Sequence, residues 1–368
     1  MHAPAGPADA DRAFARLQLI RSPRIGPVTY RQLIARFGDA RAALDALPQL
    51  ALRGGGGAPA KLAQPDAIRR ELAAAAKLGA RHVFLDDADY PRLLAELENA
   101  PAAMLVRGDL SLTARSCVAM VGARNASAAA CRFARQIAQG LAQEGVTVVS
   151  GLARGIDTSA HLGSIDGGTV GVIASGIDIA FPPENRELQE RVASEGLLIA
   201  EQPPGTEPLA RHFPSRNRII AGLALGTVVV EAAPRSGSLI TARIAGEAGR
   251  DVMAVPGSPL DPRAQGCNLL IREGATLIQS VEDIVEAIRP IDTRAMRAPI
   301  SSYTVEPAAE PGAAERRAIE SLLGPVPVPV DELIRQAALP SATVQLMLLE
   351  LELSGRLERH AGGRVSLI

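Results

Sequence analysis

The stretch VAMVGARNASAAACRFARQIAQGLAQEGVTVVSGLARGID, residues 118–157, decides the fold. It starts with an apolar run at Val118–Val121, passes through a polar turn, continues as an amphipathic segment at Ala128–Glu144 and ends in a second apolar run at Val146–Ser150. Short runs rich in valine predict buried strands, and the longer amphipathic segment between them predicts a helix.

This alternation of strands and helices extends in both directions along the chain. The other strands are expected at residues 82–85, 104–107, 169–174, 197–200, 227–231, 252–255 and 276–278. The other helices are expected at residues 158–166, 185–194, 216–223, 239–248 and 281–288. The order predicts an α/β fold with a Rossmann-like, doubly wound and mainly parallel sheet over residues 81–289. Sheets of this kind bind ligands beyond the carboxyl ends of their strands.

A helical domain is expected before this sheet. Residues 1–12 are rich in alanine and proline and are predicted to be disordered, whereas residues 13–80 show helical periodicity interrupted by a short turn. The turn Ile25-Gly26-Pro27 resembles the hairpin of a helix-hairpin-helix or SAM-like module. The usual glycine two positions before Gly26 is Arg24 here, so we expect this domain to serve packing rather than DNA binding.

A second small domain is expected at the carboxyl end. Residues 290–312 contain four prolines without periodicity and predict a linker. Residues 313–368 contain three helical segments, at 314–323, 331–337 and 341–353, and then a hairpin that turns at Gly362-Gly363. This is the order of a winged helix, which completes the predicted architecture.

Composition and charge narrow the classes of protein that fit. The net charge is −1 and the isoelectric point is about 6.6, so any binding of nucleic acid has to come from a local basic patch. The cysteines Cys117, Cys131 and Cys267 are widely spaced and form no CxxC, which is typical of reduced cysteines and not of a zinc site. No apolar run approaches the ~20 residues that a membrane span needs. We therefore expect a cytoplasmic protein that binds no membrane and no metal.

Four turns at the ends of predicted strands carry residues suited to anions. In the first, VGARNAS, Arg124 is expected to face the crevice at the end of its strand, and Ser127 can cap the following helix. In the second, SGLARGID, Ser150 and Gly151 end a strand. Glycine lets the backbone come close to a ligand there, and free amides at a helix start, together with Arg154, favour an anion.

Asp157 and His161 follow the second turn. Asp157 has two interpretations, a helix N-cap or a functional group, and both can hold together. His161 lies four residues further on and therefore on the same face of the helix. We interpret the pair as structural rather than catalytic.

The third turn, HFPSRNRIIAGLALG, concentrates positive charge. Ser215 is expected to cap a helix, which would put Arg216 and Arg218 in its first turn beside Asn217. The helix dipole disfavours each cation there by about 0.3–1 kcal/mol, and a bound phosphate would offset this cost. The alternative is an ion pair between these arginines and a nearby Asp or Glu.

The fourth turn, VVVEAAPRSGSLITA, places small hydroxyl residues at a helix start. Ser236, Gly237 and Ser238 suit phosphate oxygens, and Glu231 is expected to hold an arginine of the third turn. A mononucleotide needs one or two such turns. A row of four at one sheet edge better suits the successive phosphates of a nucleic acid strand.

Several signatures of catalysis and of cofactor binding are absent from the sequence. It contains no GxxxxGK[ST], no HExxH and no GxSxG. The string GGGAPA at residues 55–60 is the only one like a dinucleotide fingerprint, but it follows no predicted strand and is interrupted by proline. We therefore expect no catalytic residues and no cofactor.

The ordered set of motifs resembles the DNA-processing protein A family, DprA or Smf. The resemblance covers roughly residues 118–275, and the two flanking domains also fit it. The matching strings are VGAR at 121–124, SGLARGID at 150–157, Ala160-His161, FPPEN at 181–185, FPSRNRIIAGL at 213–223, VVEAAPRSGSLITA at 229–242, AVPG at 254–257 and GCNLLIREGA at 266–275. One departure is Phe181, where the family often has tyrosine.

The resemblance implies a protein of natural transformation that binds single-stranded DNA, forms a homodimer and helps to load the RecA recombinase. It implies that the DNA-contacting residues are Arg124, Ser150, Gly151, Arg216, Asn217, Arg218, Ser236, Gly237 and Ser238, with Phe213 as a stacking residue. To these the anion argument adds Arg154.

The winged helix is expected to contribute little to DNA binding. Its third helix carries Glu350 and Glu352 and no arginine or lysine, whereas a helix that enters a DNA groove normally brings cations. We expect this domain to bind protein, or to bind DNA only through Arg356, Arg359 and Arg364 of the wing. Deletion of residues 313–368 should leave the affinity for single strands nearly intact.

Two other functions remain open. The lysine-decarboxylase-like phosphoribohydrolases resemble the predicted domain in fold, but their PGGxGTxxE loop corresponds here to EAAPRSGSLITA, which has no glutamate at the helix start. The second is a scaffold that interacts with RecA and binds DNA only weakly, which the near-zero net charge and the shortage of aromatic residues favour.

Overall fold

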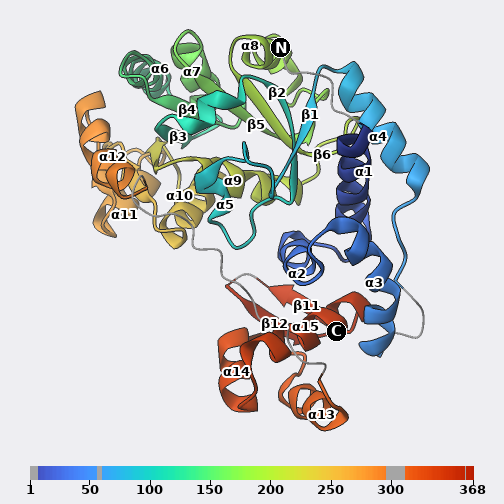
Figure 1. Ribbon diagram of the computed structural model, residues 1–368. Helices are drawn as coiled ribbons and strands as arrows, with labels where there is room; N and C mark the ends of the chain where they lie inside the picture. Colours follow the sequence, from blue (N-terminus) through green and yellow to red (C-terminus); the bar gives the residue numbers. More distant parts are fainter. Residues whose placement is uncertain (1–6, 56–59, 296–310, 361) are drawn as a thin grey trace. The chain divides into compact units, whose positions relative to one another are not determined.

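The alternating apolar runs and amphipathic segments form one sheet with helices on both faces in the computed structural model of the chain (Figure 1). The structure describes residues 7–55, 60–295, 311–360 and 362–368. It divides into two units. Residues 71–300 form a central unit, and residues 1–70 together with 301–368 form a terminal unit.

The sheet of the central unit confirms the predicted mainly parallel, doubly wound topology. Its described strands follow the order β1-β2-β6-β5-β4-β3-β7-β8-β9, and only the pairs β1–β2 and β2–β6 are antiparallel. The strands are β1 Arg81–Phe84, β2 Ala103–Gly108, β3 Cys117–Gly122, β4 Thr147–Ser150, β5 Thr169–Gly176, β6 Leu197–Gln202, β7 Gly226–Val230, β8 Asp251–Ala254 and β9 Thr276–Leu277. The chain runs outward from β3 to β6 and then restarts at β7 on the other side of β3. The switch in direction, where such sheets bind ligands, therefore lies between β3 and β7.

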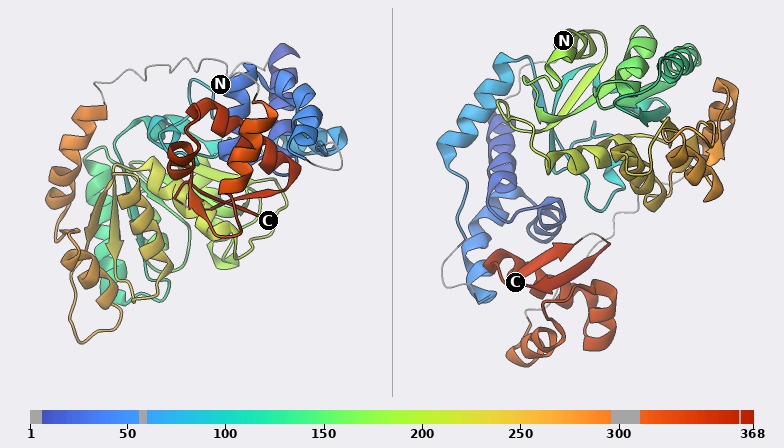
Figure 2. Two further views of the ribbon diagram at one scale, coloured as in Figure 1. Left: turned by 90° about the horizontal axis from the view of Figure 1, so that it is seen from below. Right: turned by 180° about the vertical axis from the view of Figure 1, so that it is seen from behind.

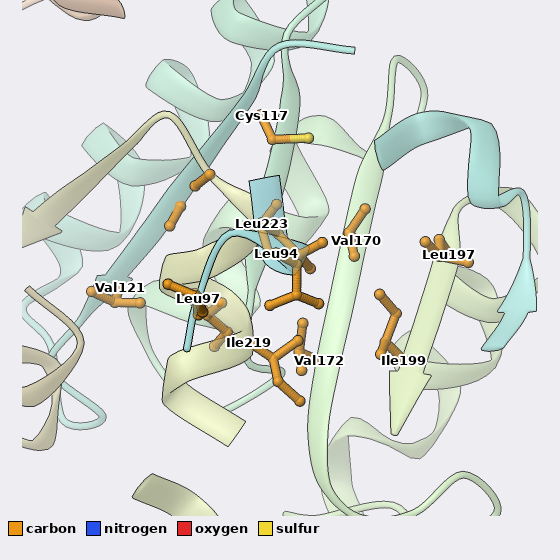
Figure 3. Close-up of a cluster of buried hydrophobic side chains, with 14 of the residues drawn as sticks. Leu94, Leu97, Cys117, Val121, Val170, Val172, Leu197, Ile199, Ile219 and Leu223 are labelled. Atoms are coloured by element: carbon orange, nitrogen blue, oxygen red, sulfur yellow. The ribbon is translucent and has the colours of Figure 1, made fainter. Parts of the chain in front are cut away.

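Helices cover both faces of this sheet because each presents one apolar stripe. The helices of the central unit are α5 Arg92–Ala95, α6 Ala128–Gln143, α7 Ile156–Ser164, α8 Arg186–Glu195, α9 His212–Leu223, α10 Gly237–Glu247, α11 Gln265–Arg272 and α12 Val281–Ala295. α5, α9, α10 and α11 share one core with the sheet (Figure 3), and α6, α7, α8 and α12 pack on the other face (Figures 1 and 2). None of the described helices is long and apolar enough to cross a membrane.

Three features of the central unit differ from the prediction. The helices α5 and α11 were not predicted. α9 begins at His212, four residues before its predicted start at Arg216. α12 continues to Ala295, so residues 290–295 of the predicted linker are helical, and residues 296–310 lie outside the described residues.

The terminal unit combines helices from the beginning of the chain with the winged helix from its end. Its first helices are α1 Pro7–Arg21, α2 Pro27–Phe37 and α3 Ala40–Arg53. α1 shows that residues 7–12, predicted to be disordered, are helical, and residues 1–6 lie outside the described residues. The division between the two units falls within the next helix, α4 Pro65–Lys77.

The predicted winged helix is confirmed at the carboxyl end. Its elements are α13 Ala313–Leu322, β10 Val328–Pro329, α14 Val330–Ala337, α15 Ser341–Ser354, β11 Leu357–His360 and β12 Arg364–Leu367. The strands pair in the order β10-β12-β11. Two of the wing arginines expected to contact DNA form ion pairs within the unit instead, Arg356 with Glu320 at 2.8 Å and Arg359 with Glu352 at 2.9 Å.

Candidate nucleic-acid interface

The four turns singled out in the sequence meet in one groove of about 720 Å³ at the switch point of the sheet. Arg124 comes from the first turn, Ala153 from the second, Asn217 from the third and Ser236 from the fourth. The parallel strands β3, β4 and β7 end at the same edge, which explains why segments distant in sequence share one groove. The expectation that the turns share one sheet edge is confirmed.

The first turn presents a cation whose charge is not paired. Arg124 lines the groove and forms no ion pair with any described residue, and its guanidinium lies 5.3 Å from the centroid of the Phe213 ring. Ser127 caps α6, because its Oγ accepts a hydrogen bond from Ala130 N at 3.1 Å. The cap holds the turn in place and leaves Arg124 directed at the groove.

Glu231 supports the first turn rather than the third. Its Oε2 accepts a hydrogen bond from Ser127 N at 2.7 Å, and its Oε1 lies 3.7 Å from Arg263 Nε. The expectation that Glu231 holds an arginine of the third turn is therefore wrong. The start of α6 offers a free backbone amide close to the end of β7, and a carboxylate satisfies it.

The second turn is built around Asp157. Asp157 Oδ2 accepts hydrogen bonds from Gly151 N at 3.1 Å and from Ala153 N at 3.4 Å, so the carboxylate fixes the loop between β4 and α7. It does not cap α7, which begins at Ile156 after Gly155. Ser150 is buried and donates to Met120 O at 2.7 Å, so its side chain holds the strand end and does not line the groove.

At two glycines of the second turn, other parts of the protein come closer to the backbone than a side chain would allow. Gly155 has φ 73°, and an added Cβ would lie 2.4 Å from Ala123 O. At Gly151 an added Cβ would lie 1.3 Å from Arg216 Nη1. The turn therefore packs against the first turn at one glycine and makes room for an arginine at the other.

His161 is fully buried on α7. Its Nδ1 lies 2.8 Å from Thr169 Oγ1, and its Nε2 has no hydrogen-bond partner in the described part of the chain. Burial, and then the nearby charge of Arg216, lower the pKa of His161 to about 3. The imidazole is neutral at physiological pH and has no access to the groove.

The arginines of the third turn do not lie at the start of their helix, where they were predicted to lie. α9 begins at His212, so Ser215 does not cap it, and Arg216 and Arg218 lie in its second turn. Both arginines are buried. The prediction of a phosphate that offsets an unfavourable first-turn position is therefore wrong, and the alternative, ion pairs within the protein, is observed.

Each of these arginines has a carboxylate partner. Arg216 Nη1 lies 4.0 Å from Asp157 Oδ2 and donates to Val172 O at 3.3 Å. Arg218 pairs with Glu201 and donates to Asn99 O at 2.7 Å. Burial raises the pKa of Asp157 and lowers the pKa of Arg216, although each charge favours the ionised form of the other. At 4.0 Å their attraction does not outweigh the loss of hydration.

The fourth turn adds a helix start and exposed charge. Ser236 is the N-cap of α10, and its Oγ lies 2.7 Å from Ser238 Oγ. Arg235 is exposed, lines the groove and forms no ion pair with any described residue. Arg263, from the loop before α11, also lines the groove and pairs with Asp261 at 2.9 Å. Neither arginine was among the predicted site residues, although Arg235 directly precedes Ser236 in the fourth turn.

A smaller pocket of about 140 Å³ adjoins the groove. Arg124, Phe213 and Arg216 line both cavities, and Phe181 and Arg154 line the smaller one only. The rings of Phe181 and Phe213 meet edge to face, with centroids 5.8 Å apart and planes at 62°. Phe181 is 44% exposed, so an apolar surface faces solvent beside the cations. Arg154 at the rim pairs with Glu184.

The described residues contain no group of three or more His, Cys, Asp or Glu side chains that could hold a metal ion. The polar and aromatic side chains that line the two cavities are those of arginine, serine, threonine, asparagine and phenylalanine, together with the carboxylate of Asp157.

Comparison with known families assigns all three parts of the chain. Residues 81–289 match the family described as DNA recombination-mediator protein A. Residues 10–74 match the DprA-like N-terminal HHH domain, and residues 304–363 match the DprA winged helix domain.

Individual relatives agree with these matches. The chain is 46% identical over 204 residues to DNA processing protein DprA of Streptococcus pneumoniae, a match that covers 55% of this chain and 72% of the relative. The X-ray structure of DNA processing protein A from Streptococcus pneumoniae aligns with a TM-score of 0.58 and 36% identity, over 70% of this chain and 86% of that chain. The structure of DNA processing protein A from Helicobacter pylori, described for its single-stranded DNA binding mode, has the same fold. It aligns with a TM-score of 0.52 and 24% identity, over 58% of this chain and 97% of that chain.

Proposed function

The chain belongs to the DNA recombination-mediator protein A family of DNA-processing proteins, and from this premise we propose that its groove binds the sugar–phosphate backbone of single-stranded DNA without catalysing a reaction. We propose further that it acts in the cytoplasm as a homodimer and loads RecA in recombination and natural transformation. The description of the Helicobacter pylori relative by its single-stranded DNA binding mode supports the choice of ligand.

The observation that carries this proposal is the charge of the groove. Arg124 and Arg235 line it and form no ion pair with any described carboxylate, so their charges are available to a ligand. The small residues Ser236 and Gly237 line the same groove at the start of α10, where backbone amides favour an anion. Arginine presents a planar set of donors that suits phosphate oxygens.

The groove favours a strand over a single nucleotide. Four arginines line the open groove. Arg124, Arg235 and Arg263 come from three separate turns, and Arg216 comes from α9. A phosphate backbone supplies successive charges to such a row. Contacts to phosphates carry no sequence information, so we expect little preference among bases.

The smaller pocket suits a base. Two of the six phenylalanines of the chain, Phe181 and Phe213, line it. Base–aromatic stacking tolerates every base, because each has a π-face, and contributes about 1–3 kcal/mol per base. We propose that one nucleotide turns its base toward Phe213 while its neighbours follow the groove.

We propose the following residues as the DNA-contacting set: Arg124, Gly151, Arg154, Phe213, Asn217, Ser236, Gly237 and Ser238, with Arg235 and Arg263 added. Arg216 and Arg218 are proposed to act mainly by positioning, because both are buried and ion-paired. The expected boundaries at residues 13 and 289 fall inside α1 and α12, so we propose that the helical domain begins with α1, that the central domain extends to the end of α12, and that the winged-helix domain comprises residues 313–368.

A hydrolytic function has less support. The groove holds one buried carboxylate, Asp157, which is engaged by two backbone amides and Arg216. The nearest histidine on the same helix, His161, is buried and has its pKa lowered to about 3, so it is no general base for a ligand in the groove. The phosphoribohydrolase alternative would be favoured only if the protein released free base from nucleoside monophosphates.

The decisive experiment is fluorescence anisotropy with labelled oligo-dT and with a duplex of equal length, over a series of salt concentrations. We expect the single strand to bind more tightly, and the affinity to fall with salt by a log–log slope of about −0.7 per phosphate neutralised. In the double variant Arg124→Ala/Arg235→Ala the slope should become shallower by about 1.4, since two phosphate contacts are lost.

The matched control is Arg243→Ala. Arg243 lies on α10, is exposed and pairs with Glu247, but it does not line the groove. The control should keep the wild-type slope. Equal binding of the duplex, or a slope that the double variant leaves unchanged, would contradict the proposal and favour the scaffold function.

A further inference from the structure

The terminal unit brings together two elements that serve DNA binding in other proteins. We call α1, α2 and α3 the helical module. The first of the two elements is the hairpin of this module, at residues 22–27. The other is α15 of the winged-helix module, α13 to β12. α14 and α15 form a helix-turn-helix, whose second helix is the one that enters a DNA groove. In both views of Figure 2 the winged-helix module lies beside α2 and α3.

The hairpin contacts α15 through the residue that replaces its glycine. Arg24 has φ 67°, a left-handed conformation that glycine favours and that other residues adopt rarely. Its Nη1 donates to Leu353 O, near the end of α15, at 3.3 Å. Gly355 follows α15, and an added Cβ there would lie 2.3 Å from the guanidinium carbon of Arg24. The side chain of Arg24 therefore occupies a site formed by the end of α15.

The contact continues along α15. Gln32 of α2 donates from Nε2 to Gln345 Oε1 at 2.9 Å. At the end of α3, an added Cβ on Gly54 would lie 2.0 Å from Glu350 O, so the two backbones meet where only a glycine fits. α15 is apolar around most of its circumference, and nine of its residues are buried. This is the pattern of a helix packed on two sides.

Charged side chains of the winged-helix module also bind partners inside the terminal unit. Glu350 is fully buried on α15 and pairs with Arg316. Arg356 donates to Gly54 O at 3.3 Å, and Arg359 donates to Gln32 Oε1 at 3.4 Å. A helix that approached phosphates would have to expose a carboxylate and release these arginines from their partners.

We propose that the winged-helix module is a docking module whose partner is the helical module of the same chain, and that this contact closes both the hairpin and α15 to DNA. The two modules lie at opposite ends of the sequence, and their contact holds the two ends together in one unit. This inference is independent of the proposed function of the groove.

The test is a cross-link in the full-length chain. Gln32→Cys and Gln345→Cys are introduced together with Cys131→Ser, because Cys117 and Cys267 are buried and Cys131 is the half-buried one of the three cysteines. A short bismaleimide should join the two new cysteines within one molecule, which denaturing mass spectrometry detects as a monomer with one linker. Saturating oligo-dT or duplex should leave the cross-linking rate unchanged.

Two variants distinguish a loss of docking from a general loss of structure. Arg24→Gly removes the guanidinium and keeps a backbone that glycine tolerates, so it should lower the docking equilibrium constant about fivefold, the factor that corresponds to one hydrogen bond. The rates are compared in urea at a concentration that leaves only a minor fraction of the wild type docked, where the variant should cross-link about fivefold more slowly. The control Arg41→Ala removes one exposed charge from α3 and should leave the rate unchanged. Cross-linked dimers instead of monomers, suppression by DNA, or a rate that Arg24→Gly does not alter would each overturn the proposal.

Discussion

Replacement of Gly151 by alanine should disrupt the ion pair between Arg216 and Asp157 beside the smaller pocket. An added Cβ would lie 1.3 Å from Arg216 Nη1 and 2.8 Å from Asp157 Oδ2. Ordinary contact between such atoms needs about 3.5 Å, so the guanidinium has to retreat by about 2 Å. The alanine therefore separates a buried ion pair although neither charged residue is itself replaced.

The size of the effect follows from these distances. Moving Arg216 Nη1 from 4.0 Å to about 6 Å from Asp157 Oδ2 weakens their attraction by about 1.4 kcal/mol at an effective dielectric constant of about 20. The hydrogen bond from Arg216 to Val172 O is lost as well, which costs about 1–3 kcal/mol when the acceptor stays buried. We expect the free energy of unfolding of the central unit to fall by about 2–4 kcal/mol.

Urea denaturation followed by far-ultraviolet circular dichroism measures this change, because the chain contains no tryptophan for fluorescence. The matched control is Gly237→Ala in the groove, where an added Cβ meets no atom within 4 Å. The control should change the free energy of unfolding by less than about 1 kcal/mol. A loss below about 1 kcal/mol in Gly151→Ala would refute the reasoning, since it would mean that Arg216 does not fill the space beside Gly151.

Three further outcomes are expected. Phe213→Leu should weaken oligo-dT binding by about 1–3 kcal/mol while the salt slope stays constant, because it removes a stacking surface and no charge; anisotropy measures both. Arg218→Ala should lower the free energy of unfolding by about 3 kcal/mol, because it removes the arginine from a mostly buried Glu201, and an altered salt slope would contradict its positioning role. His161 has a pKa of about 3 in the folded chain and about 6.5 when unfolded, so the unfolded state takes up its proton first as the pH falls. The wild type should therefore lose about 2 kcal/mol of stability between pH 6.5 and 5 that His161→Asn does not lose, as urea titrations at each pH would show.

Strand positions and the meeting of the four turns were predictable from the sequence for a physical reason. Strands buried on both faces read as continuous apolar runs, and β5 is buried along its whole length. Parallel strands end at one edge, so residues such as Arg124 and Ser236, far apart in sequence, had to share it. These inferences need only local pattern and chain order.

The environment of the arginines was not predictable from local pattern. Ser215 before Arg216 looks like a helix cap, but α9 starts earlier, at His212. The partners of the two arginines, Asp157 and Glu201, come from other elements, and no spacing rule selects them. The short α5 has too few residues to show a helical period.

The terminal unit has a consequence for how the polypeptide is connected. Because that unit contains both ends of the chain, the central unit is in effect an insertion between its two halves, tethered near residue 70 and again near residue 300. A single proteolytic nick at either tether leaves the fragments joined through the other tether and the contacts of the terminal unit. Release of the central unit under native conditions therefore requires two cuts. Of the two units, the central one is formed by a single continuous segment, residues 71–300, and the terminal one is formed by two segments.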